Sequence, residues 1–160
     1  MNVINLLFGF QGRIGRAQYW IVVAVWVGAT LALVLLMAVL TMMLDIEPPA
    51  SVFYTLVLLI YIPMIVSAVA AGIKRLHDRN KTAWWLLVFY LLPLALPWLG
   101  LLLTGGFGAD IDTLPLPVIV LYYVRVAIGI WALIELGCVR GSIGGNPYGP
   151  DPVAPRPAKH

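Results

Sequence analysis

Residues 74–85, KRLHDRNKTAWW, contain the side chains of this sequence that are best suited to chemistry. The stretch holds four cations, a neighbouring histidine and aspartate, and two tryptophans. Neighbouring histidine and aspartate residues occur in metal-dependent phosphohydrolases and in proton relays, since imidazole binds metals and titrates near neutral pH. His77 and Asp78 are therefore the first candidates for a catalytic pair.

The rest of the chain offers few partners for such a pair. The other histidine is His160, near the end of the chain, so a metal site would need additional carboxylates. Adjacent helical residues also point about 100° apart and do not face one another. The structural alternative is that Asp78 bonds Arg75 or another cation of the same helix end, and that His77 bonds a lipid headgroup or the backbone.

The composition predicts that these residues are positioned by membrane-spanning helices. The 160 residues are 62% hydrophobic and 11% charged, whereas soluble domains are about 45–50% apolar and about 25% charged. A soluble fold would leave large apolar patches in water, which proteins avoid. We therefore expect an all-α integral membrane protein.

Four apolar runs give four predicted transmembrane helices. The first run has no charged residue over 28 positions, which at about 1.5 Å per residue exceeds a hydrocarbon core of about 30 Å. We predict a four-helix bundle forming a single membrane domain over residues 1–150, with 151–160 as a flexible C-terminal tail. The predicted spans are about 17–44, 51–73, 83–104 and 115–139.

Basic residues lie at alternate ends of these spans and predict the orientation. Nine Lys and Arg precede the first span, join the second to the third, or follow the fourth, and none lies in the other two loops. Cytoplasmic loops are enriched in Lys and Arg, so we expect both termini in the cytoplasm of a bacterial inner-membrane, multi-pass protein. The acidic residues expected on the opposite side are Asp45, Glu47, Asp110 and Asp112. Because the cations flank apolar runs, we expect no nucleic-acid partner.

We expect the second helix to run past the membrane to about Arg79, and its end accounts for much of the 74–85 stretch without chemistry. Asn80 can adopt the left-handed conformation that ends helices, and cations in the last turns offset the exposed carbonyl end of the helix dipole. Thr82 can cap the next helix. Trp84 and Trp85 fit the aromatic belt at the membrane interface.

Two charges lie inside the fourth span. Arg125 is near the midplane, where a cation costs about 2.5 to 3.5 kcal/mol on insertion scales and should face the bundle or a water pocket. Its expected acceptors are carbonyls freed by Pro63, Pro93 or Pro97. Glu135 is predicted to meet Arg75 or Arg13 at the cytoplasmic boundary.

Small residues predict close helix contacts within the bundle. Ala24, Gly28 and Ala32 repeat at intervals of four, as do Ala68 and Gly72. Such stripes let helix backbones approach closely in membranes.

Three ordered motifs, GRIGRAQYW, KRLHDRNKTAWW and GGNPYGPDP, together resemble the bacterial inner-membrane family called domain of unknown function 805 (DUF 805). The resemblance implies a multi-pass inner-membrane protein and carries no catalytic or ligand role. The positions that match the family pattern are Gly12, Arg13, Arg16, Tyr19, Trp20, Arg75, Leu76, His77, Asp78, Trp84, Trp85, Gly145, Asn146, Tyr148, Gly149, Asp151 and Pro152.

With this topology all three motifs lie on one face of the membrane. The arginines can converge on the GSIGGNPYG turn, whose glycines allow an anion-binding nest of backbone N–H groups. The candidate face comprises Arg13, Arg16, Trp20, Arg75, His77, Asp78, Arg79, Trp84, Trp85, Asn146, Tyr148 and Asp151.

The leading hypothesis is a non-enzymatic module without a cofactor or metal that binds anionic lipid headgroups or a membrane protein partner at its cytoplasmic face. The alternative is a small transporter or channel using Arg125, and the third reading is a membrane enzyme using His77 and Asp78. The sequence leaves open whether the protein forms a homo-oligomer.

Overall fold

The computed structural model describes residues 2–43, 49–104 and 114–154, and within these ranges every extended regular element is a helix. Four helices are long and apolar enough to cross a membrane, as predicted. The predicted acidic loops with Asp45, Glu47, Asp110 and Asp112, most of the predicted tail and His160 lie outside the described residues.

The elements are α1 (Val3–Phe8), α2 (Arg16–Met42), α3 (Ala50–Asp78), the π-helical η1 (Leu87–Leu91), α4 (Leu92–Thr104), α5 (Leu116–Leu133) and the π-helical η3 (Ile134–Cys138).

The second spanning helix is longer than its predicted apolar run. The apolar run predicts a span over 51–73, and the helix was expected to continue to about Arg79. This is confirmed, since α3 continues to Asp78 and carries Lys74, Arg75, His77 and Asp78 on its last turns. Asn80 follows with a φ of 56°, the left-handed conformation predicted for it.

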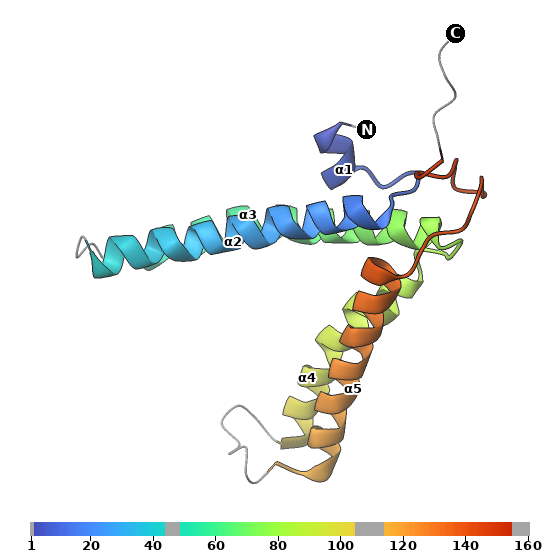
Figure 1. Ribbon diagram of the computed structural model, residues 1–160. Helices are drawn as coiled ribbons and strands as arrows, with labels where there is room; N and C mark the ends of the chain where they lie inside the picture. Colours follow the sequence, from blue (N-terminus) through green and yellow to red (C-terminus); the bar gives the residue numbers. More distant parts are fainter. Residues whose placement is uncertain (1, 44–48, 105–113, 155–160) are drawn as a thin grey trace.

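The four helices form two antiparallel hairpins that meet at one end only (Figure 1). α2 lies along α3 and α4 lies along α5, and the hairpins diverge away from η1 and η3. The first and the last described residues lie near the place where the hairpins meet, which we call the joined end.

The predicted four-helix bundle is therefore formed only at the joined end. In the part of the chain that the structure describes, no Cα atom of α2 or α3 comes within 8 Å of α4 or α5, and the backbones of the two hairpins approach through η3. The side chain of Tyr90 in η1 also reaches α3, where its hydroxyl donates to the Ala68 carbonyl oxygen. Lipid is as apolar as the helix surfaces, so no hydrophobic force drives the outer parts of the hairpins together.

Two glycines let the hairpins approach at the joined end. A Cβ atom on Gly137 of η3 would lie 2.8 Å from the Trp20 ring of α2, and the Trp20 Nε1–H donates to the Gly137 carbonyl at 3.0 Å. A Cβ atom on Gly72 of α3 would lie 2.8 Å from Leu86 and 3.0 Å from the Tyr90 hydroxyl. The close contact predicted for Ala68 and Gly72 is confirmed.

The stripe on α2 does not pack within the chain. A Cβ atom on Gly28 would meet nothing within 4 Å, and Ala24, Gly28 and Ala32 are all exposed. The close contact predicted for this stripe within a bundle is therefore wrong, because no helix of the described chain covers this side of α2.

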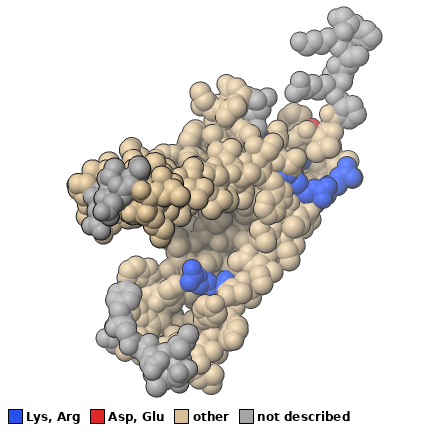
Figure 2. Space-filling view, turned by 60° about the vertical axis from the view of Figure 1, so that its left-hand side comes forward, with Lys and Arg blue, Asp and Glu red and all other residues tan. Residues whose placement is uncertain are grey.

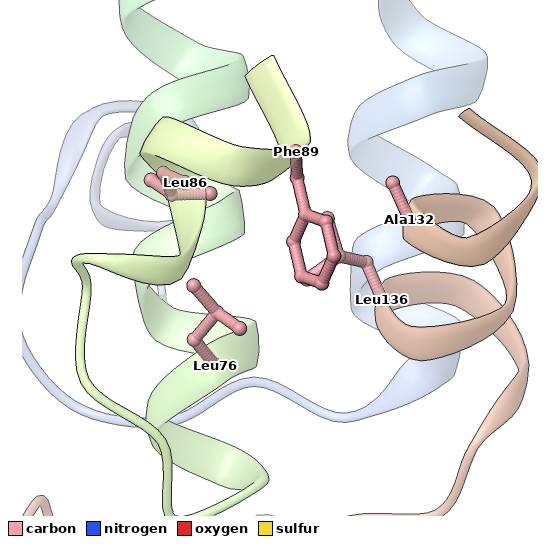
Figure 3. Packing of buried hydrophobic residues seen from close by; sticks show 5 residues of the cluster. All are labelled: Leu76, Leu86, Phe89, Ala132 and Leu136. Carbon is pink, nitrogen blue, oxygen red and sulfur yellow. The ribbon is translucent and has the colours of Figure 1, made fainter. Parts of the chain in front are cut away.

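An apolar cluster also joins the hairpins (Figure 3). Phe89 of η1 lies among the other members, which come from α3, the segment before η1, α5 and η3: Leu76, Leu86, Ala132 and Leu136. Trp85 packs beside this cluster, with its ring centroid 5.9 Å from that of Phe89 and 5.6 Å from that of Trp131. Trp84 is 74% exposed, so the two tryptophans predicted to share the interfacial belt have different environments.

Candidate functional site

Asp78 lies between two buried arginines at the joined end. The Arg13 Nε–H and Nη2–H donate to Asp78 Oδ1 at 3.2 and 3.0 Å, and the Arg75 Nη1–H donates to Asp78 Oδ2. All three residues are at most 7% exposed. Burial makes such pairs depend on complete hydrogen bonding, since an unpaired charge away from water is costly. We call these residues the arginine–aspartate cluster; it confirms the prediction that Asp78 bonds Arg75.

The C-terminal turn supplies the remaining acceptors for Arg13. Its guanidinium donates to the carbonyl oxygens of Ser142, Gly144 and Gly149 at 2.6, 2.7 and 3.2 Å. In return, the Ser142 N–H and hydroxyl both donate to the Asp78 carbonyl oxygen. The first, second and third sequence motifs therefore form one hydrogen-bond network.

Gly141 is required for this network to close. A Cβ atom at this position would lie 2.0 Å from Asp78 Oδ2, so the carboxylate occupies the place of a side chain. The sequence placed Gly141 and Ser142 in the GSIGGNPYG turn as part of a possible anion site, and it did not indicate that they would contact Asp78.

Five successive carbonyl groups at the end of the last spanning helix accept hydrogen bonds from side chains. The last carbonyls of a helix have no partner within the helix and need one from elsewhere. Here the donors come from α2, α3 and the residue after α3. The carbonyls of Leu136, Gly137, Cys138, Val139 and Arg140 accept from Arg75, Trp20, Arg16, Arg75 and Arg79, respectively.

His77 lies against the third motif. Its ring stacks on Tyr148 with a centroid distance of 3.9 Å and an interplanar angle of 4°, and its Nδ1 is 3.3 Å from the Gly12 carbonyl oxygen. The Asn146 side-chain amide donates to the His77 carbonyl oxygen at 2.8 Å. His77 and Asp78 thus have separate partners, as the structural interpretation of this pair predicted. Within the described ranges no three His, Cys, Asp or Glu residues come together as potential metal ligands.

Several N–H groups of the glycine-rich turn, where the sequence allowed an anion-binding nest, already have acceptors in the protein. The Gly144 N–H donates to Asp151 Oδ2, and the Tyr148 N–H donates to Asn146 Oδ1. The pKa of Asp151 is lowered chiefly by the Val153 N–H, with a further contribution from the Gly144 N–H. Asp151 therefore closes the turn as an anion.

Glu135 pairs with cations other than those predicted. We expected Arg75 or Arg13, but Glu135 Oε1 lies 2.8 Å from Lys81 Nζ and 3.1 Å from Arg79 Nε. This prediction was wrong because Arg13 and Arg75 are held by Asp78 and by backbone carbonyls.

A second set of cations lies around Glu135 and is partly or fully exposed at the surface of the molecule. The side chains of Arg79 and Lys81 are 25% and 29% exposed, and Arg16 and Arg140 are exposed residues. We call Arg16, Arg79, Lys81 and Arg140 the basic rim. Figure 2 shows basic side chains gathered at the joined end. One carboxylate, Glu135, pairs directly with this set, so the rim retains a positive charge.

Lys74 has an unexpected partner. Its side chain is fully buried, and its ammonium group donates to the Asn5 and Leu6 carbonyl oxygens of α1 at 2.8 and 2.6 Å. The sequence suggested only that Lys74 offsets the dipole of its own helix. No charge or motif in residues 3–8 indicates that α1 would accept this cation.

Arg125 lies far from the joined end. It is exposed on α5, and no hydrogen bond or ion pair joins it to any described residue. The prediction that carbonyls freed by prolines accept its guanidinium is therefore wrong for residues 49–104. Pro93 and Pro97 both lie in α4, and no carbonyl group of this helix accepts a hydrogen bond from Arg125.

The fold and the network at the joined end define an integral membrane protein of four spanning helices whose sequence motifs meet at one end. The chain matches the family described as "Protein of unknown function (DUF805)" over residues 7–150. It belongs to this family, which confirms the resemblance seen in the three motifs.

Three relatives from Escherichia coli K12 are similar over nearly the whole chain. The uncharacterized protein YiiR is 30% identical over 94% of this chain and 90% of its own length. The inner membrane proteins YhaH and YhaI are each 26% identical over 95% of this chain, and over 93% and 92% of their own lengths. No solved structure matches this chain. With its four spanning helices, this chain is a multi-pass protein of the bacterial inner membrane.

Proposed function

We propose that this protein is a non-enzymatic membrane module that binds the phosphate groups of anionic lipids through its basic rim. The observation that carries this proposal is the division of the cations into two sets. Arg13, Lys74 and Arg75 are buried and their donors are directed at acceptors within the chain. Arg16, Arg79, Lys81 and Arg140 remain accessible.

The surroundings of the rim favour a lipid over a soluble anion. Trp20 and Trp84 are 41% and 74% exposed at the same end of the molecule, and tryptophan prefers the depth of the lipid headgroups. Each Lys or Arg near an anionic membrane surface contributes about 1 kcal/mol to attraction. The four rim cations around one carboxylate suit this kind of attraction.

The proposal includes the orientation of the joined end toward the cytoplasm, where short loops are enriched in Lys and Arg. Ile143 is 80% exposed in the C-terminal turn and can carry a label. In a Cys138→Ser background, Ile143→Cys should react with a membrane-impermeant maleimide in inverted membrane vesicles and not in intact spheroplasts. Labelling in spheroplasts would reverse the orientation.

The lipid proposal can be tested by native mass spectrometry. The protein is reconstituted in vesicles of equal parts phosphatidylethanolamine and phosphatidylglycerol, and the lipids that it retains on gentle release are identified. The double variant Arg16→Gln/Arg140→Gln should lose about 2 kcal/mol of attraction, or roughly thirtyfold in phosphatidylglycerol affinity.

Arg125→Gln is a charge-altering control away from the rim and should retain phosphatidylglycerol. A second arm adds inorganic phosphate, which would displace the lipid if the rim bound free phosphate instead. Equal retention by the double variant and the wild type, or a bound polypeptide in place of the lipid, would contradict the proposal.

A further inference from the structure

The hairpins enclose a hollow whose walls are apolar. Away from the joined end they do not approach one another, and Figure 2 shows the hollow between them. At its base lies a groove of about 390 Å³ between α2, α3 and η1, lined by residues that include Val23, Trp26, Val27, Thr30 and Tyr90. Trp26 Nε1 is buried and has no acceptor among the described residues.

One cation belongs to this part of the molecule. Figure 2 shows a basic patch on the wall of the hollow, separate from the basic patch at the joined end. Arg125 is the one Lys or Arg in α4 and α5. It lies thirteen residues before the end of η3 and nine after the start of α5, so it is about 20 Å and about 14 Å from the two ends of this span. Arg125 therefore lies deep within the apolar layer.

A cation at this depth needs an acceptor, and the described residues 2–43, 49–104 and 114–154 supply none. Leaving it in hydrocarbon costs at least about 2.5 to 3.5 kcal/mol. The acidic residues of the four spans are Asp78 and Glu135, and both are paired with cations at the joined end. The spans of a second copy of this chain have the same two acids in the same pairs, so these spans offer Arg125 no free carboxylate.

A lipid headgroup is also poorly suited to this cation. Headgroup phosphates lie at the membrane surface, outside the apolar layer of about 30 Å, and would have to enter the apolar layer to reach Arg125. A carboxylate on a transmembrane helix needs no such movement, because the helix itself sets its depth. Intramembrane charges in proteins commonly pair with one another for this reason.

We propose that the hollow between the hairpins receives a transmembrane helix of a different protein, and that an Asp or Glu near the middle of this helix pairs with Arg125. The apolar walls contact the sides of the incoming helix, and the groove at the base accommodates its side chains. The pairing is charge-specific and lies inside the membrane, so it is separate from lipid binding at the basic rim.

Site-specific photocross-linking in cells tests the proposal. A benzoylphenylalanine in place of Thr30, which lines the groove, should form an adduct with a membrane protein, and the linked peptide should lie in a spanning segment that contains Asp or Glu. The same probe at Ala32, which is exposed and absent from the groove lining, is the matched control and should not give this adduct.

Charge variants then identify the contact. Arg125→Leu should reduce the adduct by at least about tenfold, which corresponds to 1.4 kcal/mol, while Arg125→Lys should preserve it. Because Arg125 has no partner in the described chain, neither variant should unfold at a lower temperature than the wild type. Replacing the partner's acid by Asn or Gln should also abolish the adduct, and Arg125→Glu should restore it when combined with Arg in place of that acid.

Several results would overturn the proposal. These are an adduct with a second copy of this chain, adducts with lipid alone, a partner segment without an intramembrane acid, or an adduct that persists in Arg125→Leu. An absence of any protein adduct at Thr30 would also count against it.

Discussion

At the scale of single residues, the motifs are explained by one shared carboxylate. Asp78 accepts from Arg13 and Arg75, and its carbonyl group accepts from Ser142. The sequence predicted the pairing with Arg75, because three residues separate them on one helix. It could not predict that Arg13 would also be buried, since a partner 65 residues away follows only from the tertiary structure.

Asp78→Asn should destabilise the protein strongly. The substitution leaves two buried arginines without a counter-charge, and breaking a buried pair costs about 3 to 5 kcal/mol. Glu135→Gln is the matched control, because its partners are partly exposed and such pairs contribute about 1 kcal/mol or less. The check is the free energy of unfolding in mixed micelles. A loss for Asp78→Asn no larger than that for Glu135→Gln would contradict the role given to the cluster.

At the scale of elements, the unpaired carbonyl groups at the end of a helix determine which charged side chains bind there. Apolar runs predicted all four spans, and the signals around Asn80 placed the end of α3 near Arg79. The five carbonyls from Leu136 to Arg140 need donors, and the side chains that supply them come from α2, α3 and the residue after α3. Hydropathy finds a helix and does not show which neighbour bonds its end. The sequence therefore assigned the basic residues to orientation, to the helix dipole or to an anion site, and not to these carbonyls.

Lys74→Met should release α1 from the hairpin without unfolding the spans. α1 has six residues, which is too short for a stable isolated helix, and Lys74 bonds two of its carbonyls. Hydrogen exchange of the amides in residues 3–8 should become faster, while exchange in the middle of α3 stays slow. Lys81→Met removes the same kind of charge from the rim and should leave α1 unchanged. If exchange in α1 is the same in both variants, packing alone holds this helix.

At the scale of the whole molecule, the arrangement of the hairpins was the part least accessible from sequence. Four apolar spans suggested a four-helix bundle, and small-residue stripes were expected at its helix contacts. Gly72 and Gly137 do lie at such contacts, whereas a Cβ atom on Gly28 would touch nothing. The same spacing of small residues thus occurs on packed and unpacked faces. In lipid, polar bonds and close packing decide which faces meet, and here both are concentrated at the joined end.

The open arrangement predicts which cysteine pairs can form disulfides in the protein purified alone into lipid nanodiscs. In a Cys138→Ser background, Gly100→Cys/Val118→Cys should cross-link readily. A Cβ atom on Gly100 would lie 3.5 Å from Val118 Cγ1, which is one bond away from Val118 Cβ, so the two Cβ atoms are near the spacing of about 3.5–4.5 Å that a disulfide requires. Leu35→Cys/Val120→Cys joins α2 to α5, whose Cα atoms stay more than 8 Å apart, and should remain reduced. Both pairs lie far from the joined end. The first pair lies within one hairpin, whereas the second pair would have to bridge the hollow between the two hairpins. Efficient cross-linking of the second pair would mean that the hairpins close on one another in lipid, which would leave no room for a partner helix beside Arg125.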